Sequence, residues 1–113
     1  MKTTAVGRGA EQAVAEYLLR KGYRVIDRNW RTRWCEMDII ATKDKIAYFI
    51  EVKYRSSEFQ GSGFEYIGRN KLHQLNLAVE IWATQNDWQG DCQLLAAQVT
   101  GLDYGIIELT EIE

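Results

Sequence analysis

Two strongly apolar segments separated by a short polar stretch constrain the fold of this chain more than any other feature. Residues 36–41 and 46–54 are rich in isoleucine, valine and aromatic residues, and the polar residues 42–45 lie between them. Two such segments joined by a short polar connection predict a β-hairpin. The second segment is apolar on both faces at its start, which is typical of a strand in the middle of a sheet.

Three charged residues interrupt these apolar strands: Asp38, Glu51 and Lys53. Glu51 and Lys53 are two positions apart, so their side chains project from the same face of one strand. A turn centred between Asp44 and Lys45 would place Asp38 directly opposite Glu51, and a turn centred one residue earlier would make the pair diagonal. Both registers leave the two carboxylates on one face, roughly 5–8 Å apart at their Cβ atoms.

Two buried carboxylates repel each other unless a cation lies between them. Mg²⁺ prefers hard oxygen ligands and typically takes one or two protein carboxylates, and Mn²⁺ is the alternative ion. A metal here would polarise a phosphodiester and activate water, and Lys53 would orient or deprotonate that water or neutralise developing charge. Glu11, on the polar side of the first helix, would add a carboxylate if that helix packs across the sheet. The competing interpretation is a cross-strand ion pair of Asp38 or Glu51 with a lysine.

The rest of the chain contains two helices and further strands. Apolar residues at positions 10, 13, 14, 17 and 18 share one helical face, and Gly22 follows as a C-terminal cap, so we expect a helix over residues 10–21. The same spacing predicts a second helix over residues 69–85. Glycine and serine in residues 56–68 predict a loop before it. Further strands are expected at residues 23–29, 92–99 and 104–112.

This element order, α-β-β-β-α-β-β, predicts an α/β domain in which helices flank a mixed β-sheet. The composition agrees, because 113 residues with 46% hydrophobic and 27% charged residues suffice for one globular domain over residues 1–113. The longest apolar run has five residues (46–50), and the N-terminus has no apolar signal segment. We therefore expect a cytoplasmic protein with no membrane partner. Two cysteines, Cys35 and Cys92, are expected to be free thiols.

Charge is distributed unevenly along the chain. The net charge is −2, but residues 1–33 carry eight basic and three acidic side chains, whereas residues 81–113 carry six acidic and no basic ones. The basic first third would supply an anion-binding face, unless the two ends pair in space. Trp30 and Trp34 flank Arg31 and Arg33. Aromatic residues interleaved with arginine can stack on bases, but covering the edge of a core is the favoured interpretation here.

The residues around the three charges also resemble a known family. Asp38 followed by Glu51-Val52-Lys53 resembles the active-site signature of the PD-(D/E)XK nuclease superfamily. Residues 35–41 are similar to the Gly-Glu-Ile-Asp-Leu-Ile motif, and residues 49–55 to the Phe-Val-Glu-Val-Lys-x-Arg motif, of the YraN-like family. These small uncharacterised bacterial proteins are predicted endonucleases, distantly related to archaeal Holliday-junction resolvases. The resemblance runs over roughly residues 7–85.

The resemblance implies a restriction-endonuclease-like fold and hydrolysis of DNA, branched or otherwise structured. It implies Asp38 and Glu51 as metal ligands, Lys53 as the catalytic lysine and Glu11 as a further metal-site carboxylate. Lys71 and Gln74, one turn apart on the second helix, become phosphate-contact candidates. Arg55, directly after the active strand, could likewise reach a phosphate, and a surface arginine with no such contact is the equal alternative. By analogy with resolvases, which cut two symmetric strands, a homodimer is expected.

Three features of the chain do not fit the pattern of a nuclease family and support a different function. Cys35 stands where the family has glycine, so a backbone that needs positive φ there would be distorted. Leu95 stands near the usual place of an aspartate, and the last third of the chain is acidic. The alternative is therefore a catalytically inactive nucleic-acid-binding or protein-interaction module built on the nuclease fold.

Overall fold

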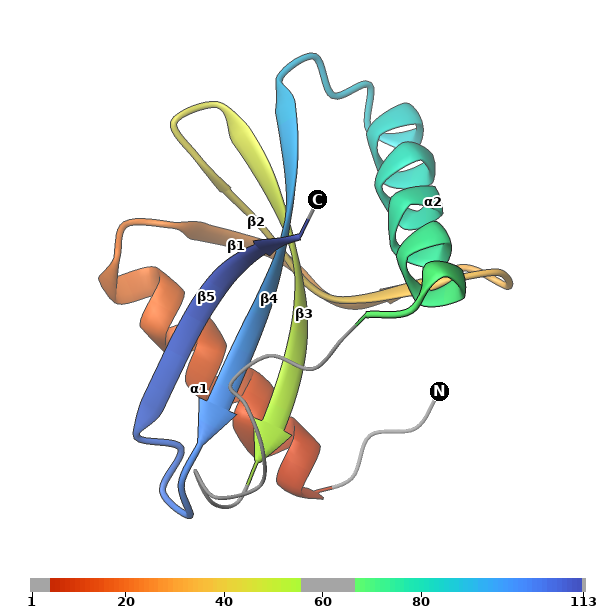
Figure 1. The fold of residues 1–113 in the computed structure, drawn as a ribbon. Coiled ribbons are helices and arrows are strands. Elements are labelled where there is room, and N and C mark those ends of the chain that lie inside the picture. The colour runs from red at the N-terminus through yellow and green to blue at the C-terminus, as the bar shows by residue number, and fades with distance from the viewer. Residues whose placement is uncertain (1–4, 56–66, 113) are drawn as a thin grey trace.

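A computed structural model describes residues 5–55 and 67–112 (Figure 1). The predicted loop at residues 56–68 therefore lies almost entirely outside the described residues. The mixed α/β architecture and the predicted element order are confirmed. In chain order the elements are α1 (Ala5–Arg20), β1 (Arg24–Arg31), β2 (Glu36–Lys43), β3 (Ile46–Arg55), α2 (Arg69–Gln85), β4 (Asp91–Thr100) and β5 (Ile106–Ile112).

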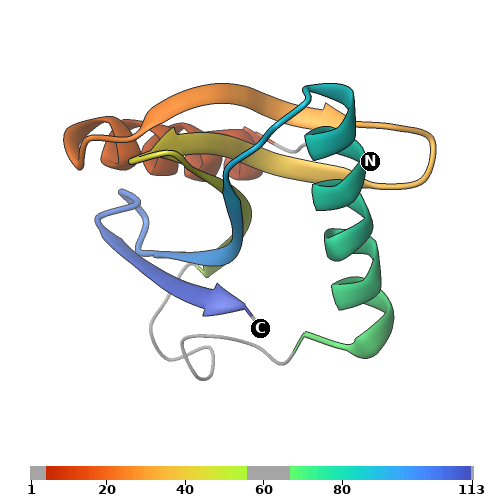
Figure 2. The same ribbon diagram turned by 90° about the horizontal axis from the view of Figure 1, so that it is seen from above.

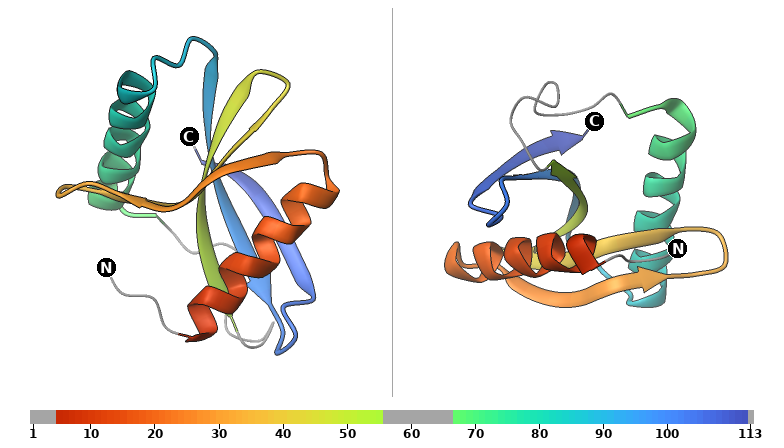
Figure 3. Two further views of the ribbon diagram at one scale, coloured as in Figure 1. Left: turned by 180° about the vertical axis from the view of Figure 1, so that it is seen from behind. Right: turned by 90° about the horizontal axis from the view of Figure 1, so that it is seen from below.

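The five strands form one sheet in the order β1-β2-β3-β4-β5. Neighbouring strands are antiparallel except for β3 and β4, which are parallel and connected through α2. The central position of β3 confirms what its two-sided apolar pattern predicted. The helices α1 and α2 pack on opposite faces of the sheet (Figures 2 and 3).

The connection between β2 and β3 is a two-residue turn. Asp44 and Lys45 both have positive φ angles, 53° and 68°, which is the signature of a type I′ turn. Lys43 pairs with Ile46 across this turn. The turn is therefore centred between Asp44 and Lys45, which is the first of the two predicted registers.

The ladder between β2 and β3 ends at the pair Ile39 and Ile50. Beyond this pair the two strands separate: β2 stays paired with β1 as far as Glu36, and β3 stays paired with β4 as far as Arg55. In Figure 1 the β1–β2 hairpin turns toward α2 while β3 and β4 continue together. We call the place where the strands separate, between Asp38 and Glu51, the fork.

Each face of the sheet has its own hydrophobic core. Adjacent residues of one strand alternate between the two cores, so Ile39 and Ile50 pack against α1 whereas Ile40 and Phe49 pack against α2. The helices contribute fully or almost fully buried side chains, Val14 and Leu18 from α1 with Leu75, Ala78 and Trp82 from α2. Both helices are thereby fixed relative to the fork.

The boundaries of α1 differ from the prediction, which gave residues 10–21. The helix begins five residues earlier, at Ala5, and ends at Arg20. Its first turn lacks the apolar periodicity that signals a helix, and Gly9 lies in its second turn, where a Cβ atom would collide with the ring of Tyr104. Gly22, with φ 93°, ends the helix as predicted, because the N–H groups of Gly22 and Tyr23 donate to the carbonyls of Leu19 and Leu18.

The other predictions agree closely with the structure. Helix α2 has the predicted bounds, and the predicted strands differ from the observed ones by at most two residues at either end. Cys35 and Cys92 are free, as expected. Within residues 5–55 and 67–112, no helix is long and apolar enough to span a membrane.

Candidate active site

The fork brings Asp38 and Glu51 together. Extending the β2–β3 register by one residue past Ile39 and Ile50 places them opposite each other. Here the side chain of Asp38 takes the place of the missing backbone ladder, because its Oδ2 accepts a 2.7 Å hydrogen bond from the N–H of Val52. The predicted pairing of two carboxylates across neighbouring strands is therefore present.

Glu51 is held by two lysines from different elements. Its side chain is 11% exposed, and its Oε2 lies 3.1 Å from Nζ of Lys71 on α2 and 3.7 Å from Nζ of Lys53 on its own strand. Both lysines remain partly exposed, at 39% and 35%. Glu51 therefore also forms ion pairs with lysines, as the competing interpretation of the sequence proposed. Lys71, expected to contact phosphate, lies directly at the carboxylate pair.

The carboxyl group of Asp38 is shifted strongly toward its protonated form. Although the residue keeps some exposed surface, the pKa of its carboxyl group is raised from 3.8 to about 7, and burial of the carboxylate is the largest cause. The negative charges of Glu51 and Glu11 also contribute to this rise, while the hydrogen bond from Val52 and the charge of Lys71 oppose it. A pKa raised by burial and a like charge marks a candidate functional site.

Glu11 reaches the same region from α1. The residue is 7% exposed, and burial raises the pKa of its carboxyl group. A hydrogen bond with Asn29 and the charge of Arg28 oppose that shift, whereas Glu36 and Glu51 add to it. Among the described residues, no hydrogen-bond partner reaches the buried Oε1 of Glu11.

Asn29 is a site residue that the sequence analysis missed. It has a positive φ of 53° inside β1, and the β1–β2 register places it level with Asp38. Asparagine tolerates this left-handed conformation better than most residues. Its hydrogen bond with Glu11 joins α1 to the fork. Nothing in the spacing of residues 23–29 signals a strand residue with such a backbone.

The donor set suits a small hard cation held by two carboxylates. Asp38 and Glu51 present oxygens from opposite sides of the fork, and their mutual repulsion contributes to the raised pKa of Asp38. No three His, Cys, Asp or Glu side chains of residues 5–55 and 67–112 form a complete metal centre.

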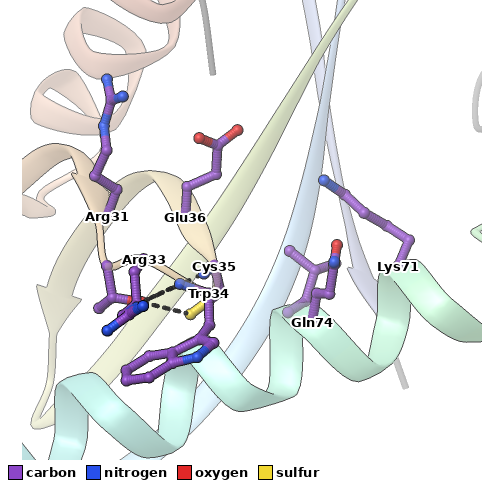
Figure 4. Close-up of a pocket in the computed structure, with 9 residues that line it drawn as sticks. Arg31, Arg33, Trp34, Cys35, Glu36, Lys71 and Gln74 are labelled. Carbon is purple, nitrogen blue, oxygen red and sulfur yellow. Dashed lines mark hydrogen bonds between the residues drawn. The ribbon is translucent and has the colours of Figure 1, made fainter.

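The remaining predicted site residues lie around this pair. Arg55 is at the end of β3, on the face shared by Glu51 and Lys53, and its guanidinium donates a 3.2 Å hydrogen bond to the carbonyl of Tyr54. Gln74 is exposed on α2 and, with Lys71, lines a cleft against the β1–β2 hairpin (Figure 4). The residues with positive φ in the described part of the chain do not include Cys35, so the distortion expected there is absent.

Comparison with known proteins supports the sequence resemblance. The sequence model of the uncharacterised protein family UPF0102 matches residues 10–102. The chain is similar to a UPF0102 protein of Fusobacterium nucleatum, 37% identical over 75 residues, which cover 66% of this chain and 63% of the relative. A UPF0102 protein of Vibrio parahaemolyticus is 34% identical over 80 residues, covering 71% and 66%. One of Herpetosiphon aurantiacus is 35% identical over 101 residues, covering 85% and 82%. The match spans just under two thirds of the length of the first two relatives.

Proposed function

The chain belongs to the UPF0102, or YraN-like, family of uncharacterised proteins, and we propose that it is a Mg²⁺-dependent endonuclease that hydrolyses phosphodiester bonds in DNA. The observation that carries the proposal is the convergence of Asp38 and Glu51 at the fork, with Lys53 on the same face. We propose branched or otherwise structured DNA as the substrate, following the resemblance to resolvases.

Asp38 and Glu51 would hold the metal ion, and water would complete its coordination. The fit rests on two hard-oxygen donors whose repulsion a cation relieves. A bound Mg²⁺ or Mn²⁺ ion would supply Lewis-acid polarisation of the phosphate and activation of water. Glu11 adds negative charge to the site from α1, and its buried Oε1 has no hydrogen-bond partner among the described residues.

Lys53 is the residue proposed to act on the reacting groups. Its Nζ lies 3.7 Å from Oε2 of Glu51, so its cation is held beside the carboxylate pair while its side chain still reaches solvent. In that position it would orient the attacking water and neutralise charge that develops on the phosphorane. Lys71, 3.1 Å from the same oxygen, would bind a neighbouring phosphate.

Two observations favour the alternative of an inactive nucleic-acid-binding or protein-interaction module. Lys53 and Lys71 already balance the charge of Glu51 without a metal ion. Leu95, near the place where the family pattern has an aspartate, is buried in the core against α1. The homodimer that the analogy with resolvases suggests stays a prediction.

The deciding experiment is a cleavage assay on linear duplex, single-stranded, flapped and four-way-junction DNA with Mg²⁺, Mn²⁺ or EDTA. We expect cutting that requires the metal ion and falls at least about 100-fold in Lys53→Ala, because a preorganised charge at the reacting phosphate is removed. Lys45→Ala, in the exposed hairpin turn, is the matched control and should cut like the wild type.

Equal cutting by the Lys53→Ala variant would show that Lys53 is not the catalytic lysine or that a contaminating nuclease is present. Salt-sensitive DNA binding that is the same in EDTA, with no cutting under any condition, would replace the nuclease by the inactive binding module.

A further inference from the structure

A cleft separates the tip of the β1–β2 hairpin from the first two turns of α2. Its volume is about 410 Å³, within the range of ligand-binding pockets. The hairpin side is formed by Arg31, Thr32, Arg33, Trp34, Cys35 and Glu36, and the helix side by Lys71, Gln74 and Leu75 (Figure 4).

The cleft is basic although the chain as a whole carries a net charge of −2. Three cations, Arg31, Arg33 and Lys71, line it against one carboxylate, Glu36. Cations gathered around a concave surface focus a positive potential into it. The cleft therefore favours an anionic ligand.

Trp34 gives the cleft an aromatic surface. Trp34 is 63% exposed, so it does not cover the edge of the core as predicted. Trp30, by contrast, does pack against the core beside α2. The guanidinium of Arg33 lies 5.4 Å from the centre of the Trp34 ring. Such an exposed aromatic ring beside a cation is suited to stacking on a nucleobase.

The tip that carries Trp34 is held in one conformation by hydrogen bonds. Oγ1 of Thr32 accepts from the N–H groups of Trp34, at 3.1 Å, and Cys35, at 3.3 Å. The N–H of Thr32 donates to the carbonyl of Cys35 at 2.8 Å. The backbone that carries the indole is therefore already ordered before a ligand binds. Less conformational entropy is lost when the ligand stacks on the indole.

Lys71 connects the cleft to the candidate active site. It lines the cleft and at the same time lies 3.1 Å from Oε2 of Glu51. In Figure 4 the side chains of Lys71 and Glu36 point to the same side of the cleft. A nucleotide bound here would have its phosphate next to the carboxylates at the fork.

We propose that the cleft binds an unpaired nucleotide of the DNA substrate, with its base stacked on Trp34 and its phosphate held by Arg31 and Lys71. The inference rests on the proposed nuclease function and narrows its substrate to DNA with a single-stranded stretch beside the cut. Bases inside a duplex have both faces covered by their neighbours, so only an unpaired base offers a free face to the indole.

Binding measured in EDTA tests this inference without any cutting. Fluorescence anisotropy of labelled DNA would compare a fully paired duplex with the same duplex carrying a single-stranded flap. We expect the full-length protein to bind the flapped DNA more tightly than the paired one. Trp34→Ala should weaken binding of the flapped DNA by about 5- to 100-fold and leave binding of the paired duplex unchanged.

Two further variants make the result specific. Trp34→Phe keeps an aromatic face and should retain most of the preference for flapped DNA. Leu19→Ala removes a side chain that is 60% exposed on α1, across the sheet from the cleft, and should bind both DNAs like the wild type.

The inference is overturned if Trp34→Ala binds flapped DNA as tightly as the wild type, or if the wild type binds the two DNAs equally. Neither result affects the proposed nuclease, whose own test is metal-dependent cutting and its loss in Lys53→Ala. Binding of flapped DNA that depends on Trp34, without cutting, would support the cleft and reject the nuclease.

Discussion

At the level of single residues, the site is dominated by the unequal situations of two carboxylates. Glu51 has two lysine partners for one of its oxygens, whereas the contact found for Asp38 is the neutral N–H of Val52. Of these two carboxylates, Asp38 is therefore the one whose negative charge has no cation in direct contact with it among the residues that the structure describes. Its raised pKa follows from that difference.

The stability of the protein should depend on pH through Asp38. Its pKa is higher in the folded chain, about 7, than its ordinary value of 3.8, so its contribution to stability is present below about pH 4 and lost as the pH rises through 7. Asp38→Asn should therefore be more stable than the wild type at pH 8, by at most about 4 kcal/mol, and this advantage should disappear by pH 4. Urea denaturation across that pH range, without divalent metal, measures both curves.

Leu19→Ala is the control for this titration, since it replaces an exposed residue that has no ionisable group. Its stability difference from the wild type should be the same at pH 4 and at pH 8. If the curves of Asp38→Asn and the wild type ran parallel, the carboxyl group of Asp38 would have an ordinary pKa.

Sequence reasoning identified the residues of the candidate site in part. Asp38, Glu51 and Lys53 stand out because they are charges in apolar strands, and the structure brings them together. The left-handed backbone of Asn29 and the exposure of Trp34 could not be predicted. Both depend on how distant elements are placed: Asn29 hydrogen-bonds to Glu11 of α1, and the hairpin tip that carries Trp34 faces α2 across a cleft.

At the level of elements, the turn between β2 and β3 fixes the register of the site. A turn centred one residue earlier would keep Asp38 and Glu51 on the same face but move them from directly opposite to diagonal positions. Sequence reasoning left two registers open because each of them suits the polar residues 42–45. The positive φ angles of Asp44 and Lys45 select the one that places the carboxylates opposite each other.

Lys45→Gly should stabilise the protein by about 1 kcal/mol, because lysine is strained at a φ of 68° and glycine is not. Thr42→Gly, in the adjoining strand, should instead destabilise it by about 0.5–1 kcal/mol. Thermal unfolding of the two variants compares the effects. A loss of stability in Lys45→Gly would mean that the turn does not have this conformation.

At the level of the whole molecule, the site depends on both hydrophobic cores. Glu11 is carried by α1 and Lys71 by α2, and each helix is attached to the sheet through its own core. A single sheet separates the two cores, so loosening either of them moves one wall of the site. The element order predicted that helices flank the sheet, but not that two helices on opposite faces would both reach one fork.

Leu18→Ala should lower the free energy of unfolding by about 2–5 kcal/mol, because Leu18 is fully buried in the core under α1. Its neighbour Leu19 is 60% exposed, so Leu19→Ala should change stability by less than about 0.5 kcal/mol. Guanidinium denaturation followed by circular dichroism gives both values. Similar losses in the two variants would contradict the orientation of α1.

The fork also divides β3 into two stretches whose backbone amide hydrogens should exchange with solvent at different rates. Residues 46–50 of β3 have a backbone partner strand on each side, so their amide hydrogens should exchange with solvent deuterium only when the sheet comes apart. The amide of Val52 is protected instead by one carboxylate oxygen of Asp38. Protonation of the Asp38 carboxylate, or binding of a cation to it, should weaken this hydrogen bond. The amide hydrogen of Val52 should then exchange faster. The NMR signal of the Val52 amide, followed over hours in deuterated solvent, would then report whether Asp38 is protonated or has bound a cation.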